Sequence, residues 1–112
     1  MSEIVEFHAH VYFDQNSLQR ARDLCEKASS LFAIDMGRVH EKPVGPHPRW
    51  SCQLLIPADL FGTVVPWLSV HRGDLTIFIH AQTDDVYKDH TQHAIWMGEM
   101  LELNLSQFKK QA

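Results

Sequence analysis

The stretch IVEFHAHVYF, residues 4–13, alternates between apolar and more polar positions with a period of two residues. This period is typical of a β-strand with one buried face, because successive side chains of a strand point to opposite sides. One face carries Val5, Phe7, Ala9, Val11 and Phe13, and the other carries Glu6, His8, His10 and Tyr12. The stretch therefore predicts a first strand that packs one side into a core and presents histidines on the other.

Two amphipathic helices are expected to cover the apolar side of this strand. The first follows it, with Asp14, Asn16 or Ser17 as its cap and an apolar stripe at helical spacing made of Leu18, Ala21, Leu24, Cys25, Ala28, Leu31 and Phe32. The second is expected over residues 57–71, where Pro66 should kink it or split it into two pieces. The apolar sides of both helices need a sheet to pack against.

Further alternating segments predict the rest of that sheet, with strands over residues 36–42, 50–56 and 74–81. Strand, helix, strand, strand, helix, strand is the order of the ferredoxin-like (βαββαβ) fold, an α+β architecture with an antiparallel sheet and both helices on one face. Beyond Thr83 the pattern predicts a C-terminal helix reaching Gly98, then a short edge strand made of Leu101, Leu103 and Leu105. We expect residues 1–112 to form a single domain, since this length suits one core.

The sheet face turned away from the two helices is predicted to be rich in histidine. His8, His10, His40 and His80, which are four of the eight histidines, fall on it. Because Tyr12, Leu55 and Phe78 would also lie there, this face is too apolar in part to be fully solvated. We therefore expect the C-terminal helix or a second copy of the chain to cover it, which predicts a homodimer.

Charge and composition exclude several classes of protein. Ten Lys and Arg against 14 Asp and Glu give a net charge of -4, so a nucleic-acid partner is not expected. No apolar run is long enough to cross a bilayer, and the first ten residues carry acids where a signal peptide carries bases, so neither membrane insertion nor secretion is expected. Cys25 and Cys52 have no zinc spacing and form no disulfide framework. These features predict a cytoplasmic protein.

His8, His10 and His80 are the candidate metal ligands. Two strand residues that are two apart have Cα atoms about 6.6 Å from each other, with both side chains on the same face. In the predicted order the fourth strand lies beside the first, so the His80 imidazole can reach the same point. The competing interpretation is an ordinary polar face of an amphipathic sheet. Imidazole-rich ligands disfavour calcium and magnesium and leave zinc, iron, copper and nickel open.

Three further histidines are candidates for proton transfer or for hydrogen bonds to the ligands. His47 is held in a loop with Pro43, Gly45, Pro46 and Pro48, and could be one more donor over the sheet. His40 and His90 could supply protons near neutral pH. Near the site, Glu6, Glu41 and Asp89 are expected to be solvated, and only Glu6 shares the histidine face.

Three motifs together resemble the DOPA 4,5-dioxygenase family of small ring-cleaving dioxygenases. They are FHAHVYFD at residues 7–14, GRVHEKPVGPHPRW at residues 37–50, and IHAQTDD with DHTQHAIWMG within residues 79–98. The resemblance implies a ferredoxin-like fold and extradiol cleavage of a catechol such as DOPA with non-haem iron(II) and dioxygen. The residues at positions matching the family's histidines are His10, His40, His47, His80 and His90.

The resemblance leaves the ligand set open. Iron must keep positions free for substrate and dioxygen, which limits the protein to about three ligands. The set implied is His10, His80 and either His47 or His8, with Glu6 as the one carboxylate candidate. His40, His47 and His90 are assigned to catalysis, as ligands or as acid–base groups.

Two other functions compete with the dioxygenase. One is a non-catalytic dimeric module that binds a metal or a small aromatic ligand. The other is a structural protein whose histidines line a polar interface. Metal content without turnover would favour the first, and the absence of stoichiometric metal would favour the second.

Overall fold

β1 (Glu6–Phe13) lies at the centre of a five-stranded sheet, because β3 (Trp50–Pro57) pairs with one of its edges and β4 (Ile77–Ala81) with the other. The computed structural model describes residues 4–108. β2 (Asp35–His40) pairs with the outer edge of β3, and β5 (Ile95–Met97) with the outer edge of β4. The order is β2-β3-β1-β4-β5, and every neighbouring pair is antiparallel. The protein thus has the expected α+β architecture.

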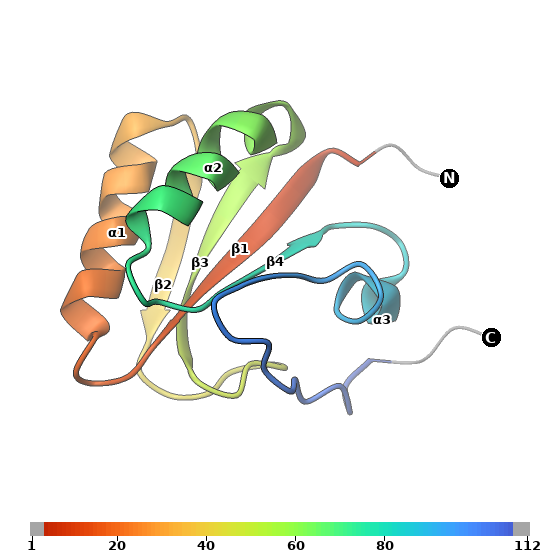
Figure 1. Cartoon of the computed structure of the whole chain (residues 1–112). Helices are drawn as coiled ribbons and strands as arrows, with labels where there is room; N and C mark the ends of the chain where they lie inside the picture. Colours follow the sequence, from red (N-terminus) through yellow and green to blue (C-terminus); the bar gives the residue numbers. More distant parts are fainter. Residues whose placement is uncertain (1–3, 109–112) are drawn as a thin grey trace.

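α1 (Leu18–Leu31) and α2 (Phe61–His71) cover one face of this sheet (Figure 1). The predicted stripe of α1 is confirmed at Ala21, Leu24, Cys25 and Ala28, which are all buried. They pack on the alternate strand residues that face the helices, Ala9, Val11, Cys52, Leu54, Ile56, Ile77 and Ile79, each 0% exposed. Cys25 and Cys52 are thiols of this core, as predicted.

The second helix is not broken by its proline. A 3-10 turn (Ala58–Leu60) precedes α2, which then continues through Pro66 to its end. A proline inside a helix frees the carbonyl four residues earlier, here that of Gly62. Gly62 and Pro66 are both exposed, so water can satisfy this carbonyl and the helix persists.

The predicted C-terminal helix and edge strand are wrong. Only α3 (Val86–Asp89) is helical in this region, and residues 95–97, which the prediction placed in the helix, form β5. Leu101, Leu103 and Leu105 form no strand. The physical reason is tertiary: Trp96 pairs with Phe78 across the β4–β5 ladder, and their stacked rings have centroids 4.6 Å apart. Burying two aromatic rings together outweighs a weak helical period over a few residues.

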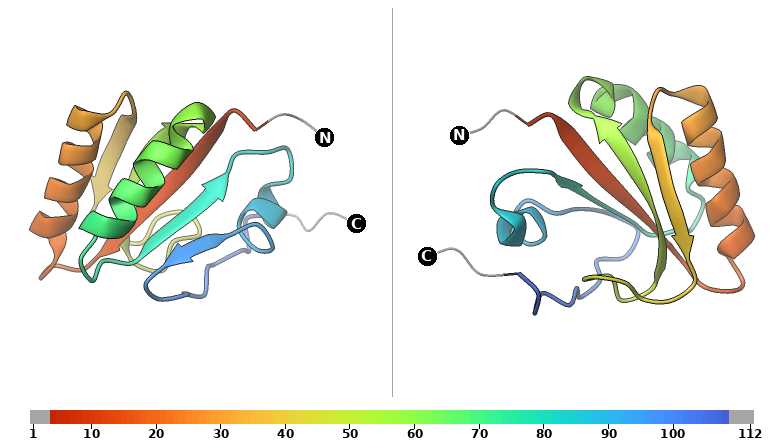
Figure 2. Two further views of the ribbon diagram at one scale, coloured as in Figure 1. Left: turned by 45° about the horizontal axis from the view of Figure 1, so that its top comes forward. Right: turned by 180° about the vertical axis from the view of Figure 1, so that it is seen from behind.

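β5 extends the sheet beyond β4, and the segments on either side of it, residues 82–94 and 98–108, lie on the side of the sheet that α1 and α2 leave free (Figure 2). The backbone N–H of Asn104 donates to the carbonyl of Pro46 at 2.9 Å, and Arg49 forms an ion pair with Glu99 at 3.2 Å. The histidine face is therefore covered, as expected, but the cover comes from this chain's own irregular segment. Because this chain supplies the cover itself, the need to cover the face is no longer an argument for a second copy. The homodimer stays a prediction.

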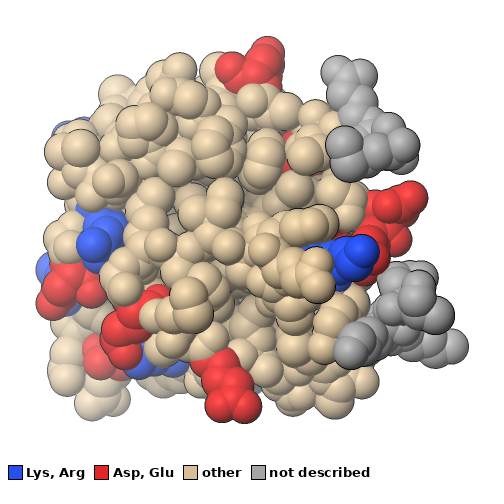
Figure 3. Space-filling model, turned by 45° about the vertical axis from the view of Figure 1, so that its right-hand side comes forward, with Lys and Arg blue, Asp and Glu red and all other residues tan. Residues whose placement is uncertain are grey.

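None of the helices within residues 4–108 combines the length and the apolar character that a bilayer crossing requires. On the face shown in Figure 3, Lys and Arg side chains lie scattered among acidic ones. That face offers no concentrated positive patch for nucleic acid.

Candidate metal centre

His8, His10 and His80 meet on the covered face of the sheet. In the β1–β4 ladder His8 lies opposite His80, and His10 follows two residues along β1 on the same side. One ligand nitrogen from each of the three side chains lies within 4.8 Å of the other two. The structure thus brings together the three residues that strand alternation and strand order placed there.

The geometry of His10 and His80 fits a shared metal ion. Their Nε2 atoms are 3.1 Å apart. Two imidazoles that bind one ion at about 2.1 Å have nitrogens about 3.0 Å apart at a right angle and about 3.4 Å apart at the tetrahedral angle. The Nδ1–H of His80 donates to the carbonyl of Ala81 at 2.9 Å, which leaves a lone pair on Nε2 of the neutral ring. The donor set therefore fits a divalent transition metal.

Burial keeps these imidazoles unprotonated. Loss of solvent holds the pKa of His10 well below its ordinary value of 6.5, and the neighbouring His47 and His80 lower it further. Burial also lowers the pKa of His80 to about 4, with smaller contributions from His90 and His8 against the opposing bond to Ala81. Since a metal binds the neutral ring, both residues are ready to act as ligands near neutral pH.

The centre is most open at His8. The His8 side chain is 17% exposed and its Nε2 lies 3.4 Å from Oε2 of Glu6. His10 and His80 are 4% and 2% exposed. Glu6 thus contacts the candidate ligand His8, but its carboxylate is not one of the groups that converge on the candidate metal site. An imidazole with a carboxylate partner is the arrangement that fixes ligand orientation in metal sites.

His47 reaches the cluster from the proline-rich loop between β2 and β3. Its ring centroid lies 4.1 Å from that of His10, and its Nδ1 is 2.7 Å from the hydroxyl of Tyr12. Burial lowers the pKa of His47 to about 4, with contributions from His90, His80 and His40. Alternation places Tyr12 on the same face as His8 and His10, but its bond to a loop histidine had no signal in the sequence.

His90 reaches the cluster from the end of α3. Its ring centroid is 4.2 Å from that of His80, and its Nδ1–H donates to the carbonyl of Val86 at 2.8 Å. Burial lowers its pKa below the ordinary value, against the opposing effect of that bond. Because a carbonyl can only accept, the neutral ring carries a lone pair on Nε2 that can take up a proton.

Asp89, expected to be solvated, is 1% exposed. Its carboxylate accepts from the backbone N–H of Thr83 at 3.0 Å and from the Thr83 hydroxyl at 2.6 Å. These bonds close the loop after β4 and so hold His90 beside His80. A buried carboxylate needs such partners, and only the folded loop supplies them.

The remaining histidines lie outside the cluster. His40 ends β2 opposite Ser51, and within residues 4–108 no ring contact joins it to the other histidines, although its charge lowers the pKa of His47. His71 donates from Nδ1 to the carbonyl of Trp67 at 2.8 Å, which agrees with its predicted place at a helix end. His93 is exposed.

Aromatic rings form one wall beside these histidines. Phe78 is 0% exposed and lies 5.7 Å, centroid to centroid, from both His10 and His90. Trp96 stacks on Phe78, and Phe108 lies 4.5 Å from His90. Trp96 lies in the segment that was predicted to be the C-terminal helix; it belongs to this wall because β5 pairs with β4.

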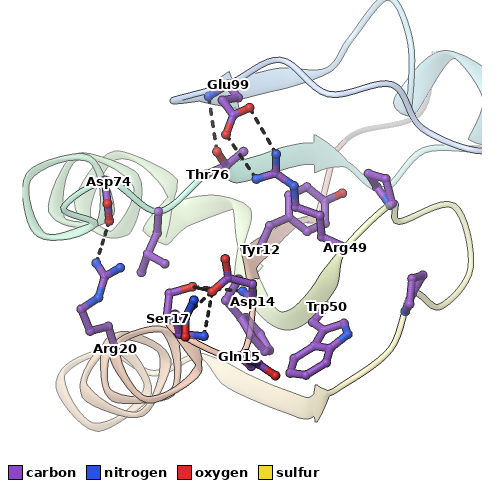
Figure 4. Close-up of a pocket in the computed structure, with 15 residues that line it drawn as sticks. Tyr12, Asp14, Gln15, Ser17, Arg20, Arg49, Trp50, Asp74, Thr76 and Glu99 are labelled. Atoms are coloured by element: carbon purple, nitrogen blue, oxygen red, sulfur yellow. Dashed lines mark hydrogen bonds and ion pairs between the residues drawn. The ribbon is translucent and has the colours of Figure 1, made fainter.

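A cleft of about 780 Å³ is lined by Tyr12 but by none of the clustered histidines (Figure 4). The start of α1, with Asp14 and Arg20, forms one side, and Arg49 and Trp50 form another. Tyr12 lines its wall, and the Tyr12 hydroxyl is hydrogen-bonded to Nδ1 of His47. Tyr12 thus contacts both the cleft and the histidine cluster.

This fold and this site define a small α+β protein whose sheet carries an imidazole cluster that can hold a metal ion. A model of the Dopa 4,5-dioxygenase family matches residues 7–107, so the chain belongs to that family. This agrees with the resemblance found in the sequence motifs.

Individual relatives agree with this membership. The chain is 35% identical over 114 residues to "DOPA 4,5-dioxygenase" of Amanita muscaria and 38% identical over 117 residues to an "Uncharacterized 21.2 kDa protein" of Botryotinia fuckeliana. These alignments cover 94% and 93% of this chain but only 50% and 63% of the relatives. A crystal structure of a "putative dioxygenase" from Nostoc punctiforme is 38% identical, with a TM-score of 0.79, and covers 91% of this chain and 89% of its own.

Proposed function

We propose that the protein is an extradiol dioxygenase that cleaves the ring of a catechol such as DOPA with non-haem iron(II) and dioxygen. The observation that carries this proposal is the convergence of His8, His10 and His80, with the Nε2 atoms of the last two 3.1 Å apart. Membership in the Dopa 4,5-dioxygenase family and the names of two relatives support it.

In this proposal His8, His10 and His80 hold the iron. Three imidazoles leave coordination positions for both substrate and dioxygen. When bound, iron(II) supplies the redox chemistry that joins the two reactants. The overall reaction balances without a further reductant: one carbon–carbon bond of the ring breaks, and both atoms of dioxygen enter the product. Zinc or another divalent metal remains an alternative occupant of the same ligands.

The chain's other residues would handle protons and exclude water. His90 has an unprotonated Nε2 beside His80 and is assigned the removal of a proton from a catechol hydroxyl. His47, against the ring of His10, is assigned the second acid–base role. His40, at the end of β2, is the third catalytic candidate. Phe78, Trp96 and Phe108 give an aromatic ring an apolar wall.

Reconstitution under anaerobic conditions with iron(II), followed by mixing with catechols and air, tests the function. A yellow ring-cleavage product that carries two atoms from ¹⁸O₂ is expected. His10→Ala should abolish it, whereas His93→Ala, a change at an exposed histidine outside the cluster, should not. No product across a catechol panel from protein with stoichiometric iron would contradict the proposal.

The tight enclosure of the cluster favours one second candidate, a non-catalytic dimeric module that binds a metal or a small aromatic ligand. His10 and His80 are almost fully buried, so a bound ion would be shielded from substrates. Stoichiometric metal and bound catechol without oxygen consumption would be the result that selects this function.

We also propose that residues 1–112 form one domain of the ferredoxin-like (βαββαβ) class, extended by β5. The order of β2, β3, β1 and β4, with both long helices on one face, supports this classification. The cytoplasmic location and the homodimer stay predictions from the sequence.

A further inference from the structure

Tyr12 is placed so that it controls His47. It lies on β1 two residues after His10, and its backbone N–H donates to the carbonyl of Thr76 at 2.9 Å. The side chain is 1% exposed, and its hydroxyl is 2.7 Å from Nδ1 of His47. The two rings meet edge to face with centroids 5.4 Å apart. Both partners of this hydrogen bond are thus held by packing on a central strand and in a proline-rich loop.

The chemistry of the two groups decides which of them donates. A phenol hydroxyl is a stronger donor than the N–H of a neutral imidazole, and an unprotonated imidazole nitrogen is a stronger acceptor than a phenol oxygen. The bond is therefore O–H to Nδ1, and the neutral His47 ring carries its single proton on Nε2.

We propose that Tyr12 is a positioning residue that fixes His47 in the tautomer with Nε2–H, so that His47 donates a hydrogen bond to an oxygen atom of the bound substrate and is not a metal ligand. Nδ1 is occupied by the Tyr12 hydroxyl, and Nε2 has no lone pair. Of the two ligand sets that the sequence leaves open, this tautomer selects His8 with His10 and His80. The donation to substrate rests on the proposed dioxygenase function, but the tautomer does not.

The opposite tautomer makes a different prediction. If the Nδ1–H of His47 donated to the phenol oxygen, Nε2 would carry a lone pair next to His10, and His47 would be a fourth ligand for the same ion. That arrangement would leave the ion fewer positions for a substrate that binds through two oxygens. The two tautomers are therefore distinguishable by a direct measurement on the imidazole nitrogens.

Nuclear magnetic resonance of the full chain labelled with ¹⁵N-histidine tests this inference. Two samples are compared, one without metal and one loaded with zinc. Long-range ¹H–¹⁵N correlation spectra distinguish protonated from unprotonated ring nitrogens, and His47→Gln assigns the His47 signals. We expect Nε2 of His47 to be protonated in both samples. Tyr12→Phe should shift Nδ1 or mix the tautomers, whereas Tyr87→Phe, at the chain's other tyrosine, should leave them unchanged. An unprotonated Nε2, or one that zinc shifts as it shifts His10, would overturn the inference.

Steady-state kinetics distinguish the positioning role of Tyr12 from the proposed dioxygenase activity. Tyr12→Phe should lower kcat by about tenfold, which is less than the loss of about a hundredfold or more for an acid–base group itself because His47 remains, with KM and the metal Kd within about twofold of wild type. If wild type cleaves catechols and Tyr12→Phe is equally fast, the positioning role is refuted while the function stands. If wild type cleaves none and the spectra show Nε2–H, the function fails and the assigned tautomer stands.

Discussion

Acidification of the metal-free protein from pH 7 to about pH 5 should lower its free energy of unfolding. His47 and His80 each have a pKa of about 4 in the folded chain, against 6.5 for an ordinary histidine, chiefly because they are buried. Between these values the unfolded chain binds more protons than the folded one. The free energy of unfolding therefore has its full value above about pH 6.5, and it decreases as the pH falls toward 4.

The size of the loss follows from these values. The pKa difference between 6.5 and about 4 corresponds to at most about 3.4 kcal/mol per histidine, and about 2 kcal/mol of it falls between pH 7 and about pH 5. His47 and His80 together should cost about 3–4 kcal/mol, a large part of the stability of a small domain, and the lowered pKa values of His10 and His90 add to this loss. Asp14 and Asp74 add little to the pH dependence between pH 7 and about pH 5, because their pKa values lie below the ordinary 3.8 and both remain charged over this range.

Urea denaturation in the presence of a chelator, at several values between these pH limits, measures the effect. His47→Gln should reduce the loss by about 2 kcal/mol, which is only part of the pH dependence because His10, His80 and His90 still contribute, and His93→Gln, at an exposed histidine, should not reduce it. A free energy of unfolding that stays constant over this range would refute the conclusion that burial keeps these rings neutral. Wild-type pH dependence in His47→Gln would refute the share assigned to that residue.

Three further predictions concern single side chains. His10→Ala should weaken zinc or iron(II) binding by at least about a hundredfold in a competition titration, since it removes a converging nitrogen; equal affinity would show that the ion binds elsewhere. Asp89→Asn should lower the free energy of unfolding by about 1–3 kcal/mol in urea, because it weakens two buried bonds to Thr83; an unchanged midpoint would mean that water replaces them. Arg49→Gln should cost less than about 1 kcal/mol, because the Arg49 and Glu99 side chains are 42% and 62% exposed; a larger loss would reveal that this pair fastens residues 82–108 over the site.

The central strand shows how far local pattern can be followed. Residues 6–13 alternate so regularly that the buried side of β1 is predicted residue by residue, and the structure confirms it at Ala9, Val11 and Phe13. The placement of His8 and His10 on the opposite side follows from the same period. The C-terminal region shows the limit, because residues 83–98 have a weak helical period and yet contribute β5 and a covering loop.

Strand alternation and the order of elements, both local properties of the chain, determine which face carries the histidines and that His80 lies beside His8. Only the folded chain decides what closes over that face, because the stacking of Trp96 on Phe78 and the hydrogen bond from Asn104 to Pro46 join residues that are distant from each other in sequence. The same holds for the bond between Tyr12 and His47, which joins groups 35 residues apart. Contacts of this kind gain their free energy from burying both partners together, and neither partner carries a local signal of it.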